Sequence, residues 1–332
     1  MYRKLQTLSA ASALAIGLAL AAPAFADETA SDENTIVVTG QAKIGDYGID
    51  LTARDLTADP GDDFERYASG AWMDRTEIPA DRPSVGSFYN LREDVTEEVN
   101  GLVTDAPAGS QYGALYTSFM DEKAIEKAGI APLKRELAQV DAISNKAEFA
   151  RYMGSTYGKF GGSLFGAGPY ADPDDPTMNT LWLSSGGLGL PEKEYYFDAK
   201  FADQRGAYLA YLERTFRHIG EASPREAASR VMTFETYVAQ LNWDAEQKRQ
   251  IEKINNPMSG SELAAYAPGV DWDAFFAGHN IPPQERIIVT DNTAVKAIAA
   301  LFASTDLDTL KLWQKAQVTH QASPYLNQKM VE

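Results

Sequence analysis

Histidine and cysteine are the side chains that most often bind zinc, and this chain has three of the first and none of the second. Two histidines can bind one metal ion from a helix when they lie four residues apart on one face, as in the motif HExxH, whose glutamate can act as general base. His218, His279 and His320 lie too far apart in the sequence to share one helical turn. We therefore predict no metal ligand among them, and expect His218 on a helix surface or interface and His279 in a loop.

Other catalytic patterns are missing from the sequence as well. It has no Gly-x-Ser-x-Gly elbow, no Ser-His-Asp spacing signature and no cysteine nucleophile. Asp172, Asp174 and Asp175 could loosely hold a cation, but their spacing is not that of a calcium loop. We interpret this stretch as a solvated acidic loop. The sequence thus predicts no catalytic residue, no metal ligand and no activity for this chain alone.

Apolar residues recur at helical spacing through most of the chain. The clearest helix begins at Ser223, Pro224 and Glu226, a predicted capping box, followed by an apolar stripe of Ala227, Val231, Phe234, Val238 and Leu241. Similar stripes predict helices through residues 91–102, 209–219, 295–302 and 307–313, and Asn145 with Glu148 predicts a helix start. Short strands are expected at 181–183 and 287–289. The predicted fold class is mainly α with short β pieces.

Three segments have a more specific pattern. The first, DDFERYASGAWMDRTEIPADRPSVGSFYNLRED at 62–94, predicts a helix, a loop and a helix, with Gly70 allowing a close turn. The second, GLGLPEKEYY at 187–196, predicts a tightly packed loop whose backbone passes close to other structure. The third, NNPMSGSEL at 255–263, predicts a turn and then a short helix opened by a Ser259–Glu262 capping box.

In this order and spacing, the three segments and the Val270–Trp272 stretch resemble the N-terminal domain of the neprilysin and endothelin-converting-enzyme family of zinc metallopeptidases. The resemblance runs from about Gly48 to the last residue. It implies the large helical lobe of a two-lobed peptidase, whose lobes close around an internal cavity and act on peptide substrates. It also implies zinc in the complete enzyme, held by a C-terminal zinc-binding peptidase domain that this chain, ending at Glu332, is expected not to contain.

The resemblance also implies a substrate contact in the first segment. In the family, two basic residues near its end help to bind the C-terminal carboxylate of the peptide. One of them aligns with Arg92; the other position is Ser84 here, and Arg82 could substitute for it. A guanidinium group matches a carboxylate with two parallel hydrogen bonds. The alternative for Arg92 is a pairing with its neighbours Glu93 or Asp94 on a solvated helix.

The N-terminus has the pattern of a secretory signal peptide. Arg3 and Lys4 precede an apolar run at 10–22, then Pro23 and the small-residue site at 24–26. The run is shorter than the roughly 20 residues of a membrane-spanning helix. We expect cleavage after Ala26, a periplasmic or secreted location, no stable membrane anchor, and a mobile acidic leader at 27–47. The net charge of −17, from 47 acidic and 30 basic residues, argues against nucleic acid as a partner.

These observations predict the organisation of the chain. Residues 48–332 form the N-terminal peptidase domain, in which 48–105 pack toward the catalytic lobe and 106–332 form the enclosing lobe. Phe64, Trp72 and Phe88 should then be more exposed in this chain than Phe234 and Leu241. The predicted function is the substrate-enclosing part of an exported zinc endopeptidase or oligopeptidase. The alternative is a non-catalytic periplasmic peptide-binding or interaction module.

Overall fold

The computed structural model describes residues 49–331 and divides the chain into two compact units, the first ending at Glu97 and the second beginning at Glu98. The predicted signal peptide (1–26) and acidic leader (27–47) lie outside the described residues and stay predictions. No helix within the described range is long and apolar enough to cross a membrane. The assignment of 48–105 and 106–332 to two lobes also stays a prediction.

The first unit contains a short 3-10 helix and the predicted helix, loop and helix. Its elements are η1 (Leu51–Ala53), α1 (Phe64–Arg75) and the first part of α2 (Ser87–Thr104). The Arg66 N–H donates to the Asp63 carboxylate at 2.8 Å, which caps the start of α1. The prediction that Gly70 makes a turn is wrong. Gly70 lies inside α1, where an added Cβ would come within 2.7 Å of the Asp55 side chain.

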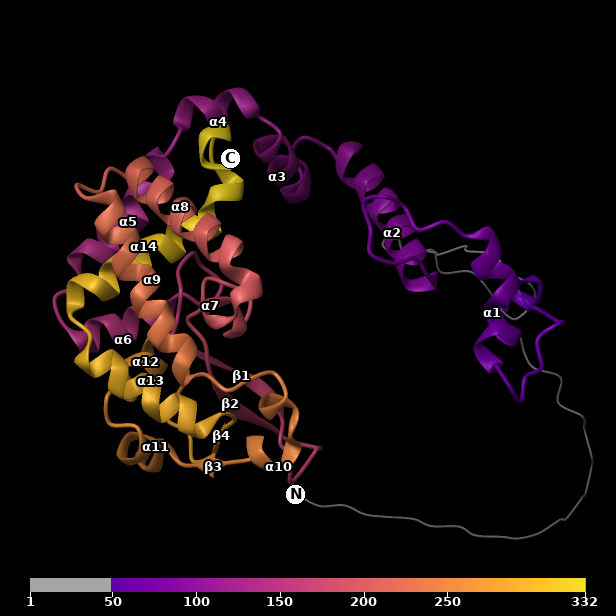
Figure 1. Cartoon of the computed structure of the whole chain (residues 1–332). Helices are drawn as coiled ribbons and strands as arrows, with labels where there is room; N and C mark the ends of the chain where they lie inside the picture. The colour runs from indigo at the N-terminus through magenta and orange to yellow at the C-terminus, as the bar shows by residue number, and fades with distance from the viewer. Residues whose placement is uncertain (1–48, 332) are drawn as a thin grey trace, which may run out of the picture. The chain divides into compact units, whose positions relative to one another are not determined.

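The second unit is mostly helical (Figure 1). Its helices are α3 (Gln111–Phe119), α4 (Glu122–Ala128), η2 (Ala131–Leu133), α5 (Lys134–Ala142), α6 (Lys146–Ser155), α7 (Glu194–Phe197), η3 (Ala199–Phe201), α8 (Ala202–Ile219), α9 (Pro224–Leu241), η4 (Gln247–Arg249), α10 (Ile251–Ile254), α11 (Gly260–Tyr266), α12 (Trp272–Gly278), α13 (Asn292–Ser304), α14 (Leu307–Ala322), η5 (Ser323–Tyr325) and α15 (Gln328–Val331).

A small mixed sheet completes the second unit, in the strand order β1-β2-β4-β3. Its strands are β1 (Phe165–Ala171), β2 (Asn179–Ser185), β3 (Pro257–Met258) and β4 (Ile287–Val289). The two predicted strands are confirmed: β2 and β4 pair in parallel, with Leu181 opposite Ile287. The sequence analysis missed β1, an edge strand antiparallel to β2. Its Gly166, Gly168 and Pro169 weaken the strand signal, since glycine and proline are depleted in strands.

The core of the second unit confirms the predicted apolar stripe of α9. Ala227, Val231, Phe234 and Val238 are buried, and the Phe234 ring packs edge-on against Trp313 of α14 at 5.8 Å between centroids. The capping box predicted at Ser223 is wrong: Ser223 precedes α9, but its backbone (φ −124°, ψ 70°) is not extended and its side chain caps no N–H. The box predicted at Ser259 and Glu262 is confirmed at the start of α11. The fold class, mainly α with short strands, is confirmed as well.

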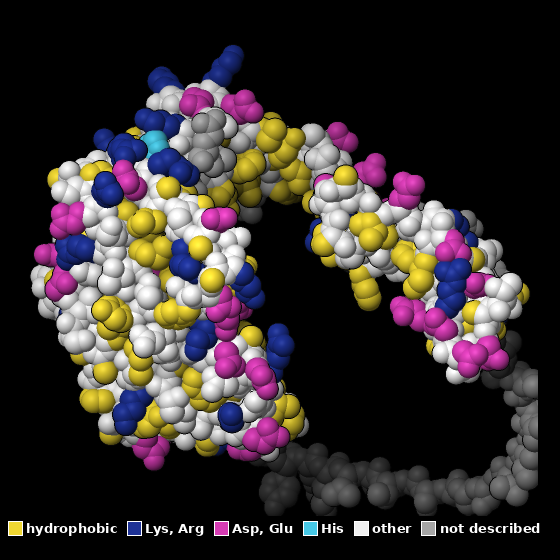
Figure 2. All heavy atoms as spheres, viewed as in Figure 1, with side chains coloured by type: hydrophobic (Ala, Val, Ile, Leu, Met, Phe, Trp, Pro, Cys, Tyr) yellow, Lys and Arg dark blue, Asp and Glu magenta, His cyan; other side chains and the backbone are white. Residues whose placement is uncertain are grey.

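Apolar side chains are exposed along α2 (Figure 2). Five of them recur at helical spacing, and each exposes about half or more of its surface: Phe88, Leu91, Val95, Val99 and Leu102. Phe64 is 68% exposed and Phe88 is 88% exposed, whereas Phe234 is 3% exposed, as the sequence predicts. Trp72 and Leu241 are both half-buried, so the predicted difference in exposure is not confirmed for this pair.

Candidate functional site

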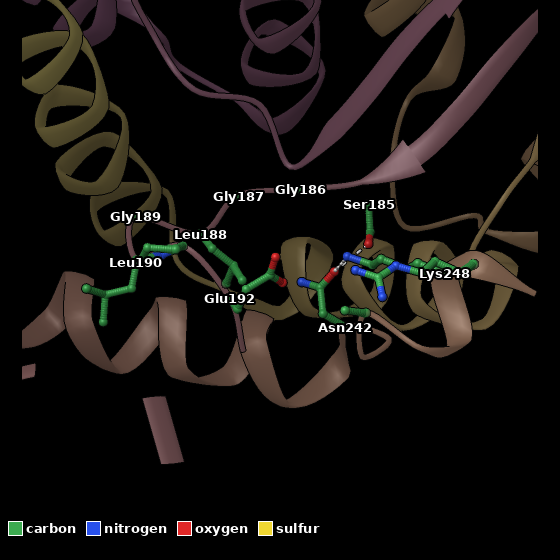
Figure 3. A pocket seen from close by; sticks show the side chains of 12 residues that line it. Ser185, Gly186, Gly187, Leu188, Gly189, Leu190, Glu192, Asn242 and Lys248 are labelled. Atoms are coloured by element: carbon green, nitrogen blue, oxygen red, sulfur yellow. Dashed lines mark hydrogen bonds between the residues drawn. The ribbon is translucent and has the colours of Figure 1, made fainter. Parts of the chain in front are cut away.

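A cavity of about 630 Å³ opens in the second unit beside the loop that follows β2 (Figure 3). One side consists of residues 185–192, which include the start of the second motif. The other side follows α9 and consists of Asn242, Ala245, Lys248 and Arg249. We call this cavity the loop pocket. All of its lining residues belong to the second unit.

Glycines allow the loop to approach the rest of the unit closely. Gly187 has a φ of +91°, a left-handed conformation that favours glycine, and an added Cβ would lie 2.5 Å from the Leu164 side chain. At Gly189 an added Cβ would lie 1.8 Å from the Tyr208 hydroxyl oxygen. The prediction of a tightly packed loop, with its backbone close to other structure, is therefore confirmed.

A buried carboxyl group fixes this loop to the helices beneath it. Glu235 of α9 is 0% exposed. Its carboxyl accepts hydrogen bonds from the Tyr196 hydroxyl at 2.9 Å, the Tyr208 hydroxyl at 3.1 Å and the Gln317 side-chain amide at 3.2 Å. The Tyr196 hydroxyl oxygen in turn accepts from the backbone N–H groups of Gly189 and Leu190, at 3.1 and 3.0 Å. The loop is thus tied through Tyr196 and Glu235 to α8, α9 and α14.

Burial changes the acidity of these groups. It raises the pKa of Glu235 to about 7, although the hydrogen bonds from Tyr196 and Tyr208 act in the opposite direction. Burial likewise raises the pKa of both tyrosine hydroxyls, and the Glu235 carboxylate raises it further. The sequence analysis missed Glu235. It lies four residues after Val231 and three before Val238, so the periodicity of α9 could have placed it on the buried face.

The wall formed by β2 and the end of α9 is held by a second polar cluster. The Ser185 hydroxyl lies within hydrogen-bond distance of both Asn242 Oδ1, at 2.5 Å, and the Asp291 carboxylate, which also accepts from the Ser185 N–H at 2.9 Å. Asn242 and Asp291 are buried. The Asn242 backbone carbonyl accepts from Lys193 Nζ at 2.7 Å, and its Nδ2 donates to the Val238 carbonyl. These hydrogen bonds therefore fix both the side chain and the backbone carbonyl of Asn242.

Charged side chains line the opening of the loop pocket. Lys248 Nζ donates to Asn242 Oδ1 at 3.5 Å, and Arg249 follows it at the end of η4. Within the described part of the chain, neither cation forms an ion pair. Glu192 is the one carboxylate among the lining residues, which include no histidine. This set of groups can bind a polar ligand, but it offers no nucleophile with an adjacent base.

The two arginines predicted to contact substrate lie in the first unit. Arg82 forms an ion pair with Glu93, with Nη2 3.0 Å from Oε2. Arg92 is exposed on α2, with its guanidinium carbon 5.6 Å from the centre of the Tyr89 ring. Glu93, one of the two neighbours expected to pair with Arg92, therefore pairs with Arg82 instead. The role of Arg82 and Arg92 in binding a peptide carboxylate stays a prediction.

The three histidines lie in separate surroundings. His218 on α8 is half-buried, and burial lowers its pKa. The His279 ring lies 4.7 Å from the Tyr157 ring, and His320 Nδ1 lies 2.9 Å from the Tyr211 hydroxyl. Among the described residues, no group of three or more histidine and acidic side chains is arranged to hold a metal ion. These residues therefore do not fit a zinc site.

The prediction of a solvated acidic loop at residues 172–175 is wrong for Asp172. This side chain is buried, and Arg286 Nε lies 2.6 Å from its carboxylate. The same guanidinium contacts Asp174 at 2.5 Å. The hydrogen bond from Arg286 lowers the pKa of Asp172. Arg286 directly precedes β4, more than a hundred residues along the chain, and the sequence alone did not reveal this pairing.

Comparison with known proteins places these features in context. Residues 60–332 match the N-terminal profile of Peptidase family M13. Over 299 residues the chain is 25% identical to endothelin-converting enzyme 1 of Rattus norvegicus, covering 84% of this chain and 39% of that protein. Neprilysin-11 of Caenorhabditis elegans is 24% identical over 303 residues, covering 80% of this chain and 36% of that protein. The chain thus spans well under half the length of these relatives.

The chain is also similar to part of several solved structures. The zinc metalloprotease ZMP1 of Mycobacterium tuberculosis, in complex with an inhibitor, is similar with a TM-score of 0.74 and 29% identity, over 86% of this chain and 45% of that one. PEPO from Lactobacillus rhamnosis has a TM-score of 0.60 at 16% identity, over 79% of this chain and 43% of that one, which shows a shared fold alone.

Proposed function

This chain belongs to Peptidase family M13, and from that premise we propose that it is the N-terminal, substrate-enclosing part of an exported zinc metallopeptidase. The complete enzyme hydrolyses peptide bonds in short peptides. The observation that carries the proposal is the similarity to the M. tuberculosis zinc metalloprotease, with a TM-score of 0.74 over 86% of this chain but only 45% of that one.

The zinc chemistry belongs to a C-terminal peptidase domain outside this chain. Two observations support this assignment: the sequence has no HExxH motif, and the described residues do not form a zinc-ligand set. The role of this chain is then to bind and enclose the peptide. The loop pocket, at about 630 Å³, is within the range of about 300–1,000 Å³ typical of ligand sites.

The exposed apolar residues of α1 and α2 supply the contact with that domain. Phe64 and the stripe of α2 from Phe88 to Leu102 leave large apolar side chains in solvent. Exposed apolar patches of more than a few hundred Å² commonly mark surfaces that bind another protein or a ligand. We assign this surface to the C-terminal peptidase domain because the relatives extend well beyond the region that this chain matches.

Export is proposed from the first 26 residues, whose charge, apolar run and small-residue site have the pattern of a cleavable signal peptide. Intact-mass measurement of the protein from a periplasmic extract tests this. The expected mature chain begins at Asp27. Recovery of the species beginning at Met1 in the membrane fraction would contradict export by cleavage.

The proposal as a whole is tested by extending the protein beyond residue 332. We expect the reading frame after codon 332 to encode HExxH, and the extended protein to bind zinc and cleave a quenched fluorogenic peptide in a chelator-sensitive way. The 332-residue chain alone should do neither. A stop codon directly after codon 332 would contradict the proposal and favour the non-catalytic peptide-binding or interaction module. Chelator-sensitive cleavage by the 332-residue chain with one tightly held zinc would also contradict it.

A further inference from the structure

We propose that Lys248 and Arg249 bind a carboxylate group of a peptide in the loop pocket. The inference rests on the proposed function, because it supposes that peptides enter the second unit. It adds the chemical group that the pocket binds, a carboxylate, and the two side chains that bind it. Neither residue lies in a segment from which we predicted substrate contacts.

The charge of the pocket lining is the first argument. The whole chain has 47 acidic and 30 basic side chains, for a net charge of −17. The loop pocket reverses this balance, since Lys248 and Arg249 line it together with one carboxylate, Glu192. These two cations are consecutive in the sequence and line the same cavity. A positive pocket on an acidic protein attracts a negatively charged ligand group selectively.

The lack of an internal partner is the second argument. Arg230 and Arg286, by contrast, are held by carboxylates of the chain at 2.8 and 2.5–2.6 Å. Lys248 has only a long hydrogen bond to Asn242 Oδ1, at 3.5 Å, and Arg249 has no ion pair within the described part of the chain. Both can therefore bind a ligand without breaking an existing ion pair. The guanidinium fork of Arg249 matches a carboxylate in particular.

The rigidity of the walls is the third argument. Asn242, beside Lys248 in Figure 3, is fixed by Ser185, by the Val238 carbonyl and by Lys193. The Lys193 amine thus adds a third positive charge next to the pocket. On the other side, Tyr196 fixes the loop backbone at Gly189 and Leu190. A pocket that is already formed costs little to order when the ligand binds.

The negative groups nearby limit the site to one carboxylate. Glu192 lines the pocket and repels a second negative charge. Asp291 lies behind Ser185, and its carboxylate is occupied by the Ser185 N–H and by the hydroxyls of Ser185 and Thr290. A carboxylate at Lys248 and Arg249 therefore leaves the remainder of the peptide to contact Glu192 and the apolar side chains of Leu188 and Leu190.

The test is calorimetric binding of three tetrapeptides to the 332-residue chain. The first is blocked at both ends and carries one glutamate; the second is identical but has glutamine there. The third is the glutamine peptide with a free C-terminal carboxylate. We expect the first, the third or both to bind about tenfold more tightly than the second, with less difference at high salt. The preferred peptide shows whether the carboxylate comes from an acidic side chain or from the C-terminus.

Variants identify the residues responsible. Lys248→Gln with Arg249→Gln should remove the preference, and the exchange Lys248→Arg with Arg249→Lys should retain it. Lys123→Gln with Lys127→Gln, exposed on α4 outside the pocket, makes the same change in net charge and should have no effect. Equal binding of all three peptides, or a preference that survives loss of Lys248 and Arg249, would overturn the inference and leave the proposed function standing. If none of the peptides binds, the inference is overturned, and the proposed function is decided by zinc binding and cleavage in the extended protein.

Discussion

Phe64 and Phe88 of the first unit expose 68% and 88% of their side chains, whereas Phe216 and Phe234 of the second unit expose 0% and 3%. Different interactions stabilise each unit internally. The second has a continuous core that includes Phe149, Phe302 and Trp313. The first relies on exposed ion pairs, such as Arg66 with Asp74 and Arg75 with Asp50. Exposed ion pairs contribute little to stability, so we expect the first unit to be less stable than the second.

The largest expected effect comes from removing one aromatic ring from each unit. Phe234→Ala should lower the free energy of unfolding of the second unit by about 3–5 kcal/mol, because it leaves a cavity against Trp313. Phe88→Ala should change it by less than about 0.5 kcal/mol, since the ring makes few contacts to lose. Urea unfolding followed by circular dichroism measures both. Similar losses for the two variants would show that the first unit has a core of its own.

The buried carboxyl of the second unit and two exposed carboxyls of the first should give stability opposite dependences on pH. In the second unit, the pKa of Glu235 is raised from 4.5 to about 7 by burial. The folded state therefore keeps this proton while the unfolded state loses it. The resulting stabilisation is present below pH 4.5 and is lost as the pH rises through about 7, a change on the order of 3 kcal/mol. Glu235→Gln should remove this dependence in urea titrations between pH 4.5 and 8.

Two carboxyls of the first unit have lowered pKa values instead. Hydrogen bonds from Thr57 and from Arg66 hold the pKa values of Asp55 and Asp74 below their usual value of 3.8. Their stabilisation is present above pH 3.8 and is lost as the pH falls below it. If the stability of the wild-type protein and that of Glu235→Gln depend on pH in the same way between pH 4.5 and 8, the buried carboxyl does not determine the pH dependence of the second unit's stability.

A smaller effect is expected from Gly189→Ala in the loop of the candidate site. The added Cβ would lie 1.8 Å from the Tyr208 hydroxyl oxygen, so that Tyr208 or the loop must move. Such overpacking costs about 1–3 kcal/mol. Gly206→Ala in α8 is the matched control, because its Cβ would meet no atom within 4 Å, and it should stabilise the helix slightly. Thermal unfolding distinguishes them, and a Gly189→Ala protein as stable as the control would mean that the loop is not tightly held.

Local patterns could be predicted from the sequence, and contacts between distant segments could not. The stripe of α9, the start of α6 at Asn145 and the strands at 181–183 and 287–289 all follow from spacing within a few residues. The glycine pattern of 187–189 likewise predicts a close-packed loop. The family resemblance came from three segments in register, which the match over residues 60–332 confirms.

What the sequence could not show depends on tertiary structure. The buried Asp172 pairs with Arg286, which directly precedes β4. The Glu235 carboxyl finds its side-chain hydrogen-bond partners in Tyr196, Tyr208 and Gln317, from three other segments. The pocket between residues 185–192 and Lys248 forms because the end of α9 meets the loop after β2. Arg82 pairs with Glu93, a choice among several nearby acidic residues that spacing does not decide.

Hydrogen exchange of the 332-residue chain and of the protein extended through the C-terminal domain tests the central claim most directly. In the 332-residue chain, amides of α2 from Ser87 to Thr104 should exchange faster than those of α9 from Pro224 to Leu241, because regions with few contacts open first. In the extended protein, exchange over α2 should slow by about tenfold or more while α9 stays unchanged. Equal protection of α2 in both proteins would contradict the account, because its apolar stripe would then have no partner in the complete enzyme.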